Sequence, residues 1–346
     1  MTPERRRPAH AKRRDVDPPG QGISVRKSIK VFSAVALSLV VIASAFLLVH
    51  ALRSTPAGTY PVDAEFGVST PGLPNDLAGL KTLRRSLGVT PGIGMWYDQW
   101  SLDPNFPVAQ ATAIAKLGIT PEITWEPWNP SDGVNQPQYD LASIIDGSHD
   151  AYIRNWARQI KAWHGTVRLS FAQEMNANWY PWCEGVNGNA PGAYSKAWQH
   201  VYNIFKSVGA RNVIWVWSPN TQFPGSTPFS ASWPGDSYVS QVALDGYNWG
   251  STRSDTRWQS FSQVFSPSVN ALTALTQKPL YIGEVASAED GGNKASWITN
   301  MFAVLKASPA IKGFVWFDHD KETDWRINSS TASLAAFRSG LADYRR

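Results

Sequence analysis

The sequence predicts an α/β protein whose main domain is a (β/α)8 TIM barrel, preceded by a single N-terminal transmembrane helix. Three observations support this. Strand-like and helix-like segments alternate over roughly the last 285 of the 346 residues. Polar and aromatic side chains gather where the predicted strands end. An apolar run of 22 residues, residues 31–52, precedes the alternating region.

The first 30 residues differ in composition from the rest of the chain. They carry nine Lys and Arg residues and three acidic residues, with Pro and Gly between them. A segment so charged and so poor in apolar residues cannot form a core, so a basic, disordered tail is expected. The remaining chain has 23 basic and 24 acidic residues. This near-neutral balance gives no electrostatic footprint for nucleic-acid binding, so none is expected.

Residues 31–52 are long and apolar enough for a membrane-spanning helix, which needs about 20 such residues. The basic tail should remain in the cytoplasm, which places the rest of the chain outside the cell. We expect a retained signal anchor at 31–52, a linker at 53–61 and the barrel at 62–346, in a single-pass membrane protein. A signal peptide cut near residues 43–45 is the alternative, and would give a secreted protein.

The strands are predicted from short apolar runs rich in β-branched and aromatic residues. In chain order they are Glu65–Ser69, Gly92–Tyr97, Thr120–Trp125, Val167–Phe171, Val213–Trp217, Val242–Tyr247, Leu280–Gly283 and Ile311–Phe317. The helices are predicted from apolar spacing of three and four residues. They are Asp76–Ser86, Val108–Lys116, His149–Trp163, Ala193–Val208, an irregular helix near Trp233–Ser240, Trp258–Leu275, Lys294–Ala307 and Thr331–Leu341.

Eight strand–helix pairs in about 285 residues match the usual size of an eight-fold barrel. An open doubly wound sheet is the alternative architecture. The number of units and the absence of a Gly-rich phosphate loop favour the barrel. Active sites of such barrels lie at the carboxyl ends of the strands, where the motifs below are found.

Two predicted strands each end in a single carboxylate. The stretch RLSFAQEMNANWYPW, residues 168–182, presents Glu174 among amides and aromatic residues. The stretch LYIGEVA, residues 280–286, presents Glu284. Two such carboxylates suit glycoside hydrolysis, which needs a proton donor and a nucleophile or base.

Aromatic residues gather at the same predicted rim. All 17 Trp residues lie after residue 90, and Trp217 is among those at the strand ends. Any single Trp could equally serve core packing. As a group they favour a carbohydrate cleft, because Trp stacks on the apolar faces of sugar rings. Trp217 is therefore a candidate substrate contact.

The sequence resembles glycoside hydrolase family 26. The resemblance covers about residues 65–330 and rests on eight barrel units, on E-M-N followed by W-Y-P-W after strand four, and on G-E after strand seven. It implies that Glu174 is the acid/base and Glu284 the nucleophile. Known members cut β-1,4-mannan, mixed-linkage β-1,3-1,4-glucan or β-1,3-xylan.

The same resemblance implies further substrate-binding residues. The tyrosine of the family motif D-x-Y corresponds to Tyr247, with Asp245 before it, and would hydrogen-bond the nucleophile. The tryptophan five residues past the acid corresponds to Trp179, near the leaving-group sugar. The strand-eight tryptophan corresponds to Trp316, a platform under the cleaved sugar.

The chain departs from the mannanase pattern at two positions. Gln173 stands before the acid, where many mannanases of the family have His. Phe317 follows the strand-eight tryptophan, where several mannanases have Arg. Both positions are expected near the glycone subsites, so mixed-linkage glucan gains weight against mannan.

Other chemistries are weighed against this interpretation. Glu126 could bind a sugar hydroxyl or be a solvated loop residue, and Glu184 is expected to be solvated. Residues 318–320, D-H-D, lack a recognised ligand spacing, so we expect neither metal nor cofactor. The lone Cys183 excludes an intrachain disulfide. A Ser-His-Asp hydrolase is disfavoured, because there is no G-x-S-x-G elbow.

The sequence thus predicts a monomeric, membrane-anchored, extracellular endo-β-glycosidase acting on a β-linked polysaccharide. A double displacement by Glu174 and Glu284 would retain the anomeric configuration, with the carboxyl groups about 5 to 5.5 Å apart. The alternative is a catalytically inactive carbohydrate-binding or scaffold barrel.

Overall fold

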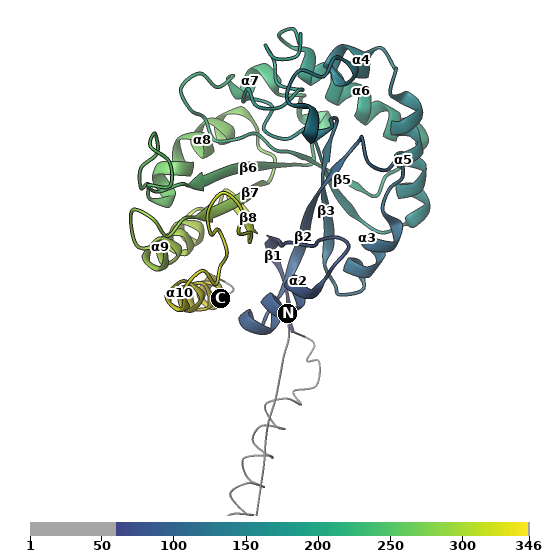
Figure 1. Ribbon diagram of the computed structural model, residues 1–346. Coiled ribbons are helices and arrows are strands. Elements are labelled where there is room, and N and C mark those ends of the chain that lie inside the picture. Colours follow the sequence, from purple (N-terminus) through teal and green to yellow (C-terminus); the bar gives the residue numbers. More distant parts are fainter. Residues whose placement is uncertain (1–59, 345–346) are drawn as a thin grey trace, which may run out of the picture. The chain divides into compact units, whose positions relative to one another are not determined.

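The computed structural model describes residues 60–344, which contain a closed barrel of eight parallel strands in sequential order, β1 to β8 (Figure 1). The strands are β1 Val62–Ser69, β2 Thr90–Gln99, β3 Thr120–Glu126, β4 Val167–Phe171, β5 Val213–Trp217, β6 Gln241–Asn248, β7 Leu280–Ser287 and β8 Ile311–Phe317. Pairing of β1 with β8 closes the sheet. The predicted eight-fold barrel is confirmed, and the open sheet is excluded.

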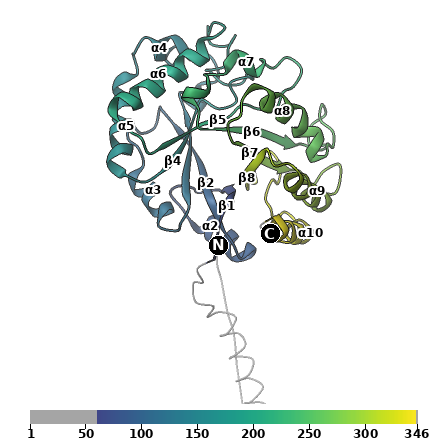
Figure 2. The same cartoon turned by 180° about the vertical axis from the view of Figure 1, so that it is seen from behind.

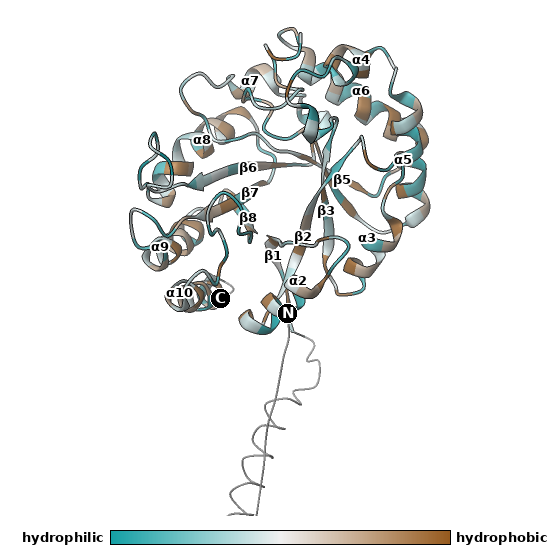
Figure 3. Ribbon diagram, in the orientation of Figure 1, coloured by the Kyte–Doolittle hydropathy of each residue, from teal (hydrophilic) through white to brown (hydrophobic). Residues whose placement is uncertain are grey.

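Helices follow the strands and cover the outside of the sheet (Figures 1 and 2). They are α2 Ala78–Leu87, α3 Val108–Ala115, α4 Leu141–Ile145, α5 Asp150–Trp163, α6 Ala193–Val208, α7 Phe229–Ser232, α8 Phe261–Leu275, α9 Lys294–Ala307 and α10 Thr331–Tyr344. Figure 3 shows hydrophobic and hydrophilic residues interleaved along these helices, as expected where one side is buried. The short α4 was not predicted, since its five residues are too few for a recognisable period.

The predicted transmembrane segment, residues 31–52, and the tail before it lie outside the described residues. Within residues 60–344, no helix is both long enough and apolar enough to cross a membrane.

Side chains alternate between the inside and the outside of the barrel wall. Ile93, Met95 and Val315 form a small cluster of their own, with Tyr97 and Tyr281 packed against it, and mark the interior. In contrast, Phe314 packs against Phe302 of α9 and Phe337 of α10. Because residues two apart in a regular strand share a face, this pattern decides the side-chain direction wherever the pairing is unbroken.

A bulge in β7 interrupts this alternation at Gly283 and Glu284. Ile282 pairs with Phe314 and Val285 with Trp316, so three positions of β7 span two positions of β8. Ile282 and Val285 therefore both face the outer helices, and the two residues between them lie on the inner side. In a regular strand Glu284 would share the outward direction of Ile282. The extra residue turns Glu284 into the barrel.

The bulge depends on a glycine. A Cβ at Gly283 would lie 2.4 Å from Asp245 Oδ1 and 2.7 Å from Ala243 Cβ, both on the neighbouring β6. Asp245 is the β6 partner of Glu284 in the register between β6 and β7. The close approach of its carboxyl thus leaves no room for a side chain at Gly283.

We expect Gly283→Ala to lower the free energy of unfolding by about 1 to 3 kcal/mol, because the added methyl overpacks a closed site. Urea unfolding of the purified protein measures this. Gly79→Ala in α2 is the matched control. Its new Cβ would have no neighbour closer than 3.4 Å, so helix propensity should make it neutral or stabilising by about 0.5 to 1 kcal/mol. Unchanged stability of Gly283→Ala would contradict the role of the bulge.

Candidate active site

Three carboxyl groups meet at the mouth formed by the carboxyl ends of the strands. Glu126 ends β3, Glu174 follows β4 and Glu284 lies in β7. They are 3%, 9% and 8% exposed. The charges of Glu174 and Glu126 both raise the pKa of Glu284, so the three groups lie within electrostatic reach of one another. Such convergence of buried acids in one mouth is typical of a catalytic site.

Two tyrosines hold both oxygens of Glu284. The Tyr97 hydroxyl donates to Oε1 at 2.5 Å, and the Tyr247 hydroxyl donates to Oε2. Burial, followed by the charge of Glu174, raises the pKa of Glu284 to about 7, and the two hydroxyls oppose that shift. Burial also raises the pKa of both tyrosines well above 10, so they remain donors. The carboxylate is thereby fixed in orientation.

Tyr247 lies beside the predicted nucleophile as the family resemblance implied. Tyr97 was not predicted. Tyr97 lies in β2 two residues after Met95, so its side chain points into the barrel as that of Met95 does. The sequence does not show which face of β2 points inward, so this direction could not be predicted. Tyr97 of β2 is thus a second donor to Glu284, in addition to Tyr247 of β6.

Glu174 sits in an unusual backbone conformation just beyond β4. Its φ is 52° and that of Ala172 is 51°, in the left-handed region that non-glycine residues rarely adopt. The Glu174 N–H donates to Ser218 O after β5, which anchors this turn. Backbone strain of this kind concentrates at functional sites, where the surroundings enforce it.

The Glu174 carboxyl accepts two N–H groups. Trp179 Nε1 donates to Oε2 at 2.8 Å, and Asn220 Nδ2 donates to Oε1 at 2.5 Å. Burial raises the pKa of Glu174, and these two donors oppose the shift. Burial therefore favours the protonated form of Glu174, and the two donors stabilise the carboxylate that remains once the proton has left.

Gln173 and Glu126 form a buried pair beside the acid. Gln173 Nε2 donates to Glu126 Oε1 at 2.7 Å, and Trp182 Nε1 donates to the backbone O of Gln173. Gln173 Oε1 has no hydrogen-bond partner among the described residues. A buried acceptor without a donor is costly, and a substrate hydroxyl would satisfy it. The predicted substrate-binding role of Gln173 is thus chemically possible, and Glu126 is buried rather than solvated.

Trp179 has the most exposed ring among the predicted aromatic contacts. It is 39% exposed, and its indole stacks on Phe223 with centroids 5.4 Å apart and planes 20° apart. One face is therefore covered by Phe223. The exposed remainder, next to Glu174, is available for a sugar.

The predicted substrate contacts of Trp217 and Trp316 need correction. Both side chains are fully buried. Trp217 packs on Phe229 and Trp233, and Trp316 packs on Trp297 of α9 and Phe337 of α10. Alternation along β5 and β8 turns both rings outward, to the helices. They belong to the packing between sheet and helices and cannot form a platform in the mouth.

A different tryptophan packs against Tyr247, one of the two tyrosines that donate to Glu284. Trp325, from the loop after β8, lies 5.1 Å from the Tyr247 ring and 4.8 Å from the Trp249 ring. It was not predicted, because it lies eight residues beyond the end of β8. Nothing in the local sequence shows that this loop folds back over the mouth.

Asp245, predicted as a substrate contact, is instead a buried residue next to Glu284. It is 2% exposed, beneath Glu284, and its Oδ1 has no partner among the described residues. Burial and the charge of Glu284 raise its pKa well above the ordinary range. Its contact with the β7 bulge makes it a support of Glu284 rather than a substrate contact.

The described residues contain no group of three or more His, Cys, Asp or Glu side chains able to hold a metal ion. The three side chains of the D-H-D stretch, residues 318–320, each contact a different partner. Asp318 accepts from Ile327 N, His319 bonds Ser69 Oγ, and Asp320 pairs with Arg326.

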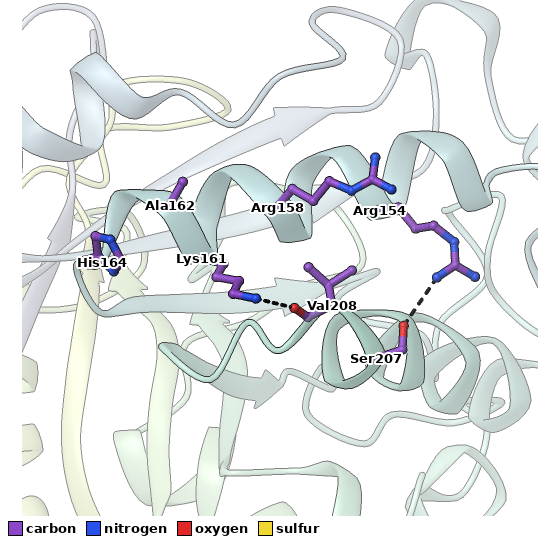
Figure 4. A pocket seen from close by; sticks show the side chains of 7 residues that line it. All are labelled: Arg154, Arg158, Lys161, Ala162, His164, Ser207 and Val208. Carbon is purple, nitrogen blue, oxygen red and sulfur yellow. Dashed lines mark hydrogen bonds between the residues drawn. The ribbon is translucent and has the colours of Figure 1, made fainter.

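A cavity of about 530 Å³ lies elsewhere, between α5 and α6 on the outside of the barrel. Figure 4 shows it lined by Arg154, Arg158, Lys161, Ala162, His164, Ser207 and Val208. Lys161 Nζ donates to Val208 O, and Arg154 pairs with Asp150. None of the three mouth carboxyls lines it, so the cavity is separate from the candidate active site.

Fold and site together define a barrel of the glycoside hydrolase class, with one buried carboxyl just after β4 and one in β7. Comparison with known proteins identifies the family. Residues 134–301 match the model described as Glycosyl hydrolase family 26. The chain is 37% identical over 300 residues to Endoglucanase H of Acetivibrio thermocellus, covering 85% of this chain and 32% of that protein. Residues 134–301, which include Glu174 and Glu284, therefore belong to glycosyl hydrolase family 26.

Two other relatives agree with this assignment. The chain is 26% identical over 172 residues to Mannan endo-1,4-beta-mannosidase A and B of Caldalkalibacillus mannanilyticus, covering 47% of this chain and 31% of that protein. The structure of a GH26 beta-mannanase from Bacteroides ovatus has a TM-score of 0.61 at 16% identity, covering 85% of this chain and 91% of that chain. That likeness concerns the fold. The chain spans about a third of the length of the curated relatives it matches.

The burial of Glu126 predicts a pH-dependent stability. Burial raises the pKa of Glu126 to about 7, so the folded state binds this proton more tightly than the unfolded state does. The resulting stability is fully present below about pH 4.5 and is lost as the pH rises through 7. Glu126→Gln removes the titration. Above pH 8 it should be more stable than the parent by about 3 kcal/mol, and near pH 4 the difference should vanish.

Urea unfolding across pH 4 to 8 measures this difference. Glu184→Gln is the control. Glu184, in the loop after β4, is only half-buried, whereas Glu126 is almost fully buried. Parallel profiles for the parent and Glu126→Gln would contradict the prediction.

Proposed function

We propose that this chain is a retaining endo-β-glycosidase that hydrolyses a β-linked polysaccharide. The observation that carries the proposal is the pair of carboxyl groups with different donors. Glu284 is held by two tyrosine hydroxyls, and Glu174 by two N–H groups. An inactive binding barrel would have no need for two buried acids held in this way, since each is costly to bury.

In the first step, Glu174 protonates the glycosidic oxygen while Glu284 attacks the anomeric carbon. The carbon–oxygen bond breaks, the leaving chain departs with the proton, and a glycosyl ester forms on Glu284. In the second step, Glu174 takes a proton from water, the water oxygen attacks the anomeric carbon, and Glu284 is released. Two inversions give net retention.

Mixed-linkage β-1,3-1,4-glucan is the polymer we favour, with β-1,4-mannan second. Gln173 and Phe317 replace the residues that many mannanases carry at these positions. Gln173 offers its free Oε1 to a sugar hydroxyl and lies on Glu126. Endoglucanase H, by its name a glucanase, is 37% identical to the chain.

The location is a second part of the proposal. We infer that residues 31–52 anchor a monomeric enzyme in the cell membrane with the barrel outside, because an apolar run follows a basic tail. Cell fractionation tests this, and the intact barrel in the cytosol would contradict it. A mature N-terminus between residues 44 and 60 would favour a cleaved signal and a secreted enzyme.

The activity is tested with a reducing-sugar assay on barley β-glucan, mannan and xylan. We expect Glu284→Ala to abolish turnover, and azide to restore part of it by entering the vacated space. Glu174→Ala should slow hydrolysis of poor leaving groups far more than of activated aryl glycosides, which need no proton.

The configuration of the first product separates retention from inversion. Proton NMR of a fresh digest should show the β-anomer, and the carboxyl separation in a crystal structure should be about 5 to 5.5 Å. An inverted product, or a separation beyond about 6.5 Å, would overturn the assignment.

A further inference from the structure

The loop after β5, residues 218–228, meets the predicted acid/base at three places. Ser218 O accepts the backbone N–H of Glu174. Asn220 Nδ2 donates to Glu174 Oε1 at 2.5 Å. Phe223 stacks on Trp179, whose Nε1 donates to Glu174 Oε2. One loop therefore reaches both oxygens of the carboxyl, one directly and one through Trp179.

Asn176 fastens this loop to the segment that carries Glu174. Asn176 is fully buried. Its Oδ1 accepts the Asn220 N–H at 2.9 Å, and its Nδ2 donates to Asn220 O at 2.9 Å. Its backbone O accepts the Thr227 N–H at 2.8 Å. Reciprocal hydrogen bonds of a buried amide leave Asn220 little freedom to move relative to Glu174.

The orientation of the Asn220 amide is also determined. Thr221 Oγ1 donates to Asn220 Oδ1 at 3.3 Å, which leaves Nδ2 facing Glu174. An amide NH2 and an indole N–H donate and cannot accept. Among the described residues the Glu174 side chain has these two hydrogen bonds and no other. A proton on Glu174 thus finds no acceptor in the Asn220 amide NH2 or the Trp179 indole N–H.

We propose that Asn220 is a positioning residue for the acid/base, and that Phe223 acts in the same way through Trp179. Because both neighbours of Glu174 are donors, its O–H is left to point at the glycosidic oxygen. The same N–H groups then stabilise the carboxylate that must accept a proton from water. The catalytic consequence rests on the function proposed above, whereas the hydrogen-bond geometry does not.

The test compares Asn220→Ala and Asn220→Asp with Gln222→Ala. Gln222 lies on the same loop, is exposed, and uses only its backbone N–H, which donates to Ser268 Oγ. Asn220→Ala removes a donor. Asn220→Asp keeps the shape but places a carboxylate against Glu174, so that the proton can be shared between two acids. Equal thermal midpoints of parent and variants identify those that have folded.

The first measurement needs no substrate. In protein labelled with ¹³C-carboxyl glutamate, the Glu174 signal is identified by its loss in Glu174→Gln and followed by NMR titration. Both Asn220 variants should titrate at higher pH than the parent, and Gln222→Ala should coincide with it. A folded Asn220→Asp with the titration of the parent would overturn the proposal, even if Asn220→Ala did not fold.

The second measurement is kcat/KM against pH on the best polymer and on an activated aryl glycoside. The Asn220 variants should lose about tenfold or more on the polymer, lose much less on the aryl substrate, and move the alkaline limb to higher pH. Equal losses on both substrates with an unmoved limb would show a merely structural role. A shifted NMR titration in a parent without activity on any polymer would refute the proposed function and leave the positioning role standing.

Discussion

The inward turn of Glu284 at the bulge of β7 is the constraint on which the active site depends. A regular strand would point this carboxyl at the outer helices, away from Tyr97, Tyr247 and Glu174. The bulge requires the absence of a side chain at Gly283, because Asp245 Oδ1 would lie 2.4 Å from any Cβ there. Asp245 is also the residue of β6 that pairs with Glu284, so it lies directly beside the bulge. A local irregularity in pairing thus converts a wall residue into a candidate nucleophile.

Burial and hydrogen bonding act in opposite directions on the mouth carboxyls. Burial is the largest cause of the raised pKa of Glu126, Glu174 and Glu284, and donors lower each of them. Glu284 is held by hydroxyls of tyrosines from β2 and β6, and Glu174 by N–H groups from the loops after β4 and β5. The two acids therefore have distinct surroundings. Such a difference in environment is how one site assigns separate roles to two carboxyl groups.

The tryptophans divide into two populations according to strand direction. Trp217 and Trp316 face outward and fill the space between sheet and helices. Trp179 comes from the loop after β4 and lies beside Glu174 in the mouth, whereas Trp325, from the loop after β8, is buried against Tyr247. Rich Trp content therefore supports two separate tasks, packing of the barrel wall and lining of the site. Composition cannot separate them, because the same side chain suits both.

The sequence by itself determined the barrel, its strand order and most of its helices, and it placed Glu174 and Glu284 at strand ends, because period and strand-end position are local properties. The helix predicted near Trp233–Ser240 is instead α7, Phe229–Ser232, followed by a single 3-10 turn at Asp236–Tyr238. Val167–Phe171, Ala193–Val208 and Ile311–Phe317 were predicted with the bounds that the structure has. Tertiary structure alone decided the direction of Trp217 and Trp316, the support role of Asp245, and the places of Tyr97, Asn220 and Trp325. A side chain's direction depends on register with neighbouring strands, and one bulged residue reverses it. Such pairing joins segments far apart in the chain, so no local pattern records it.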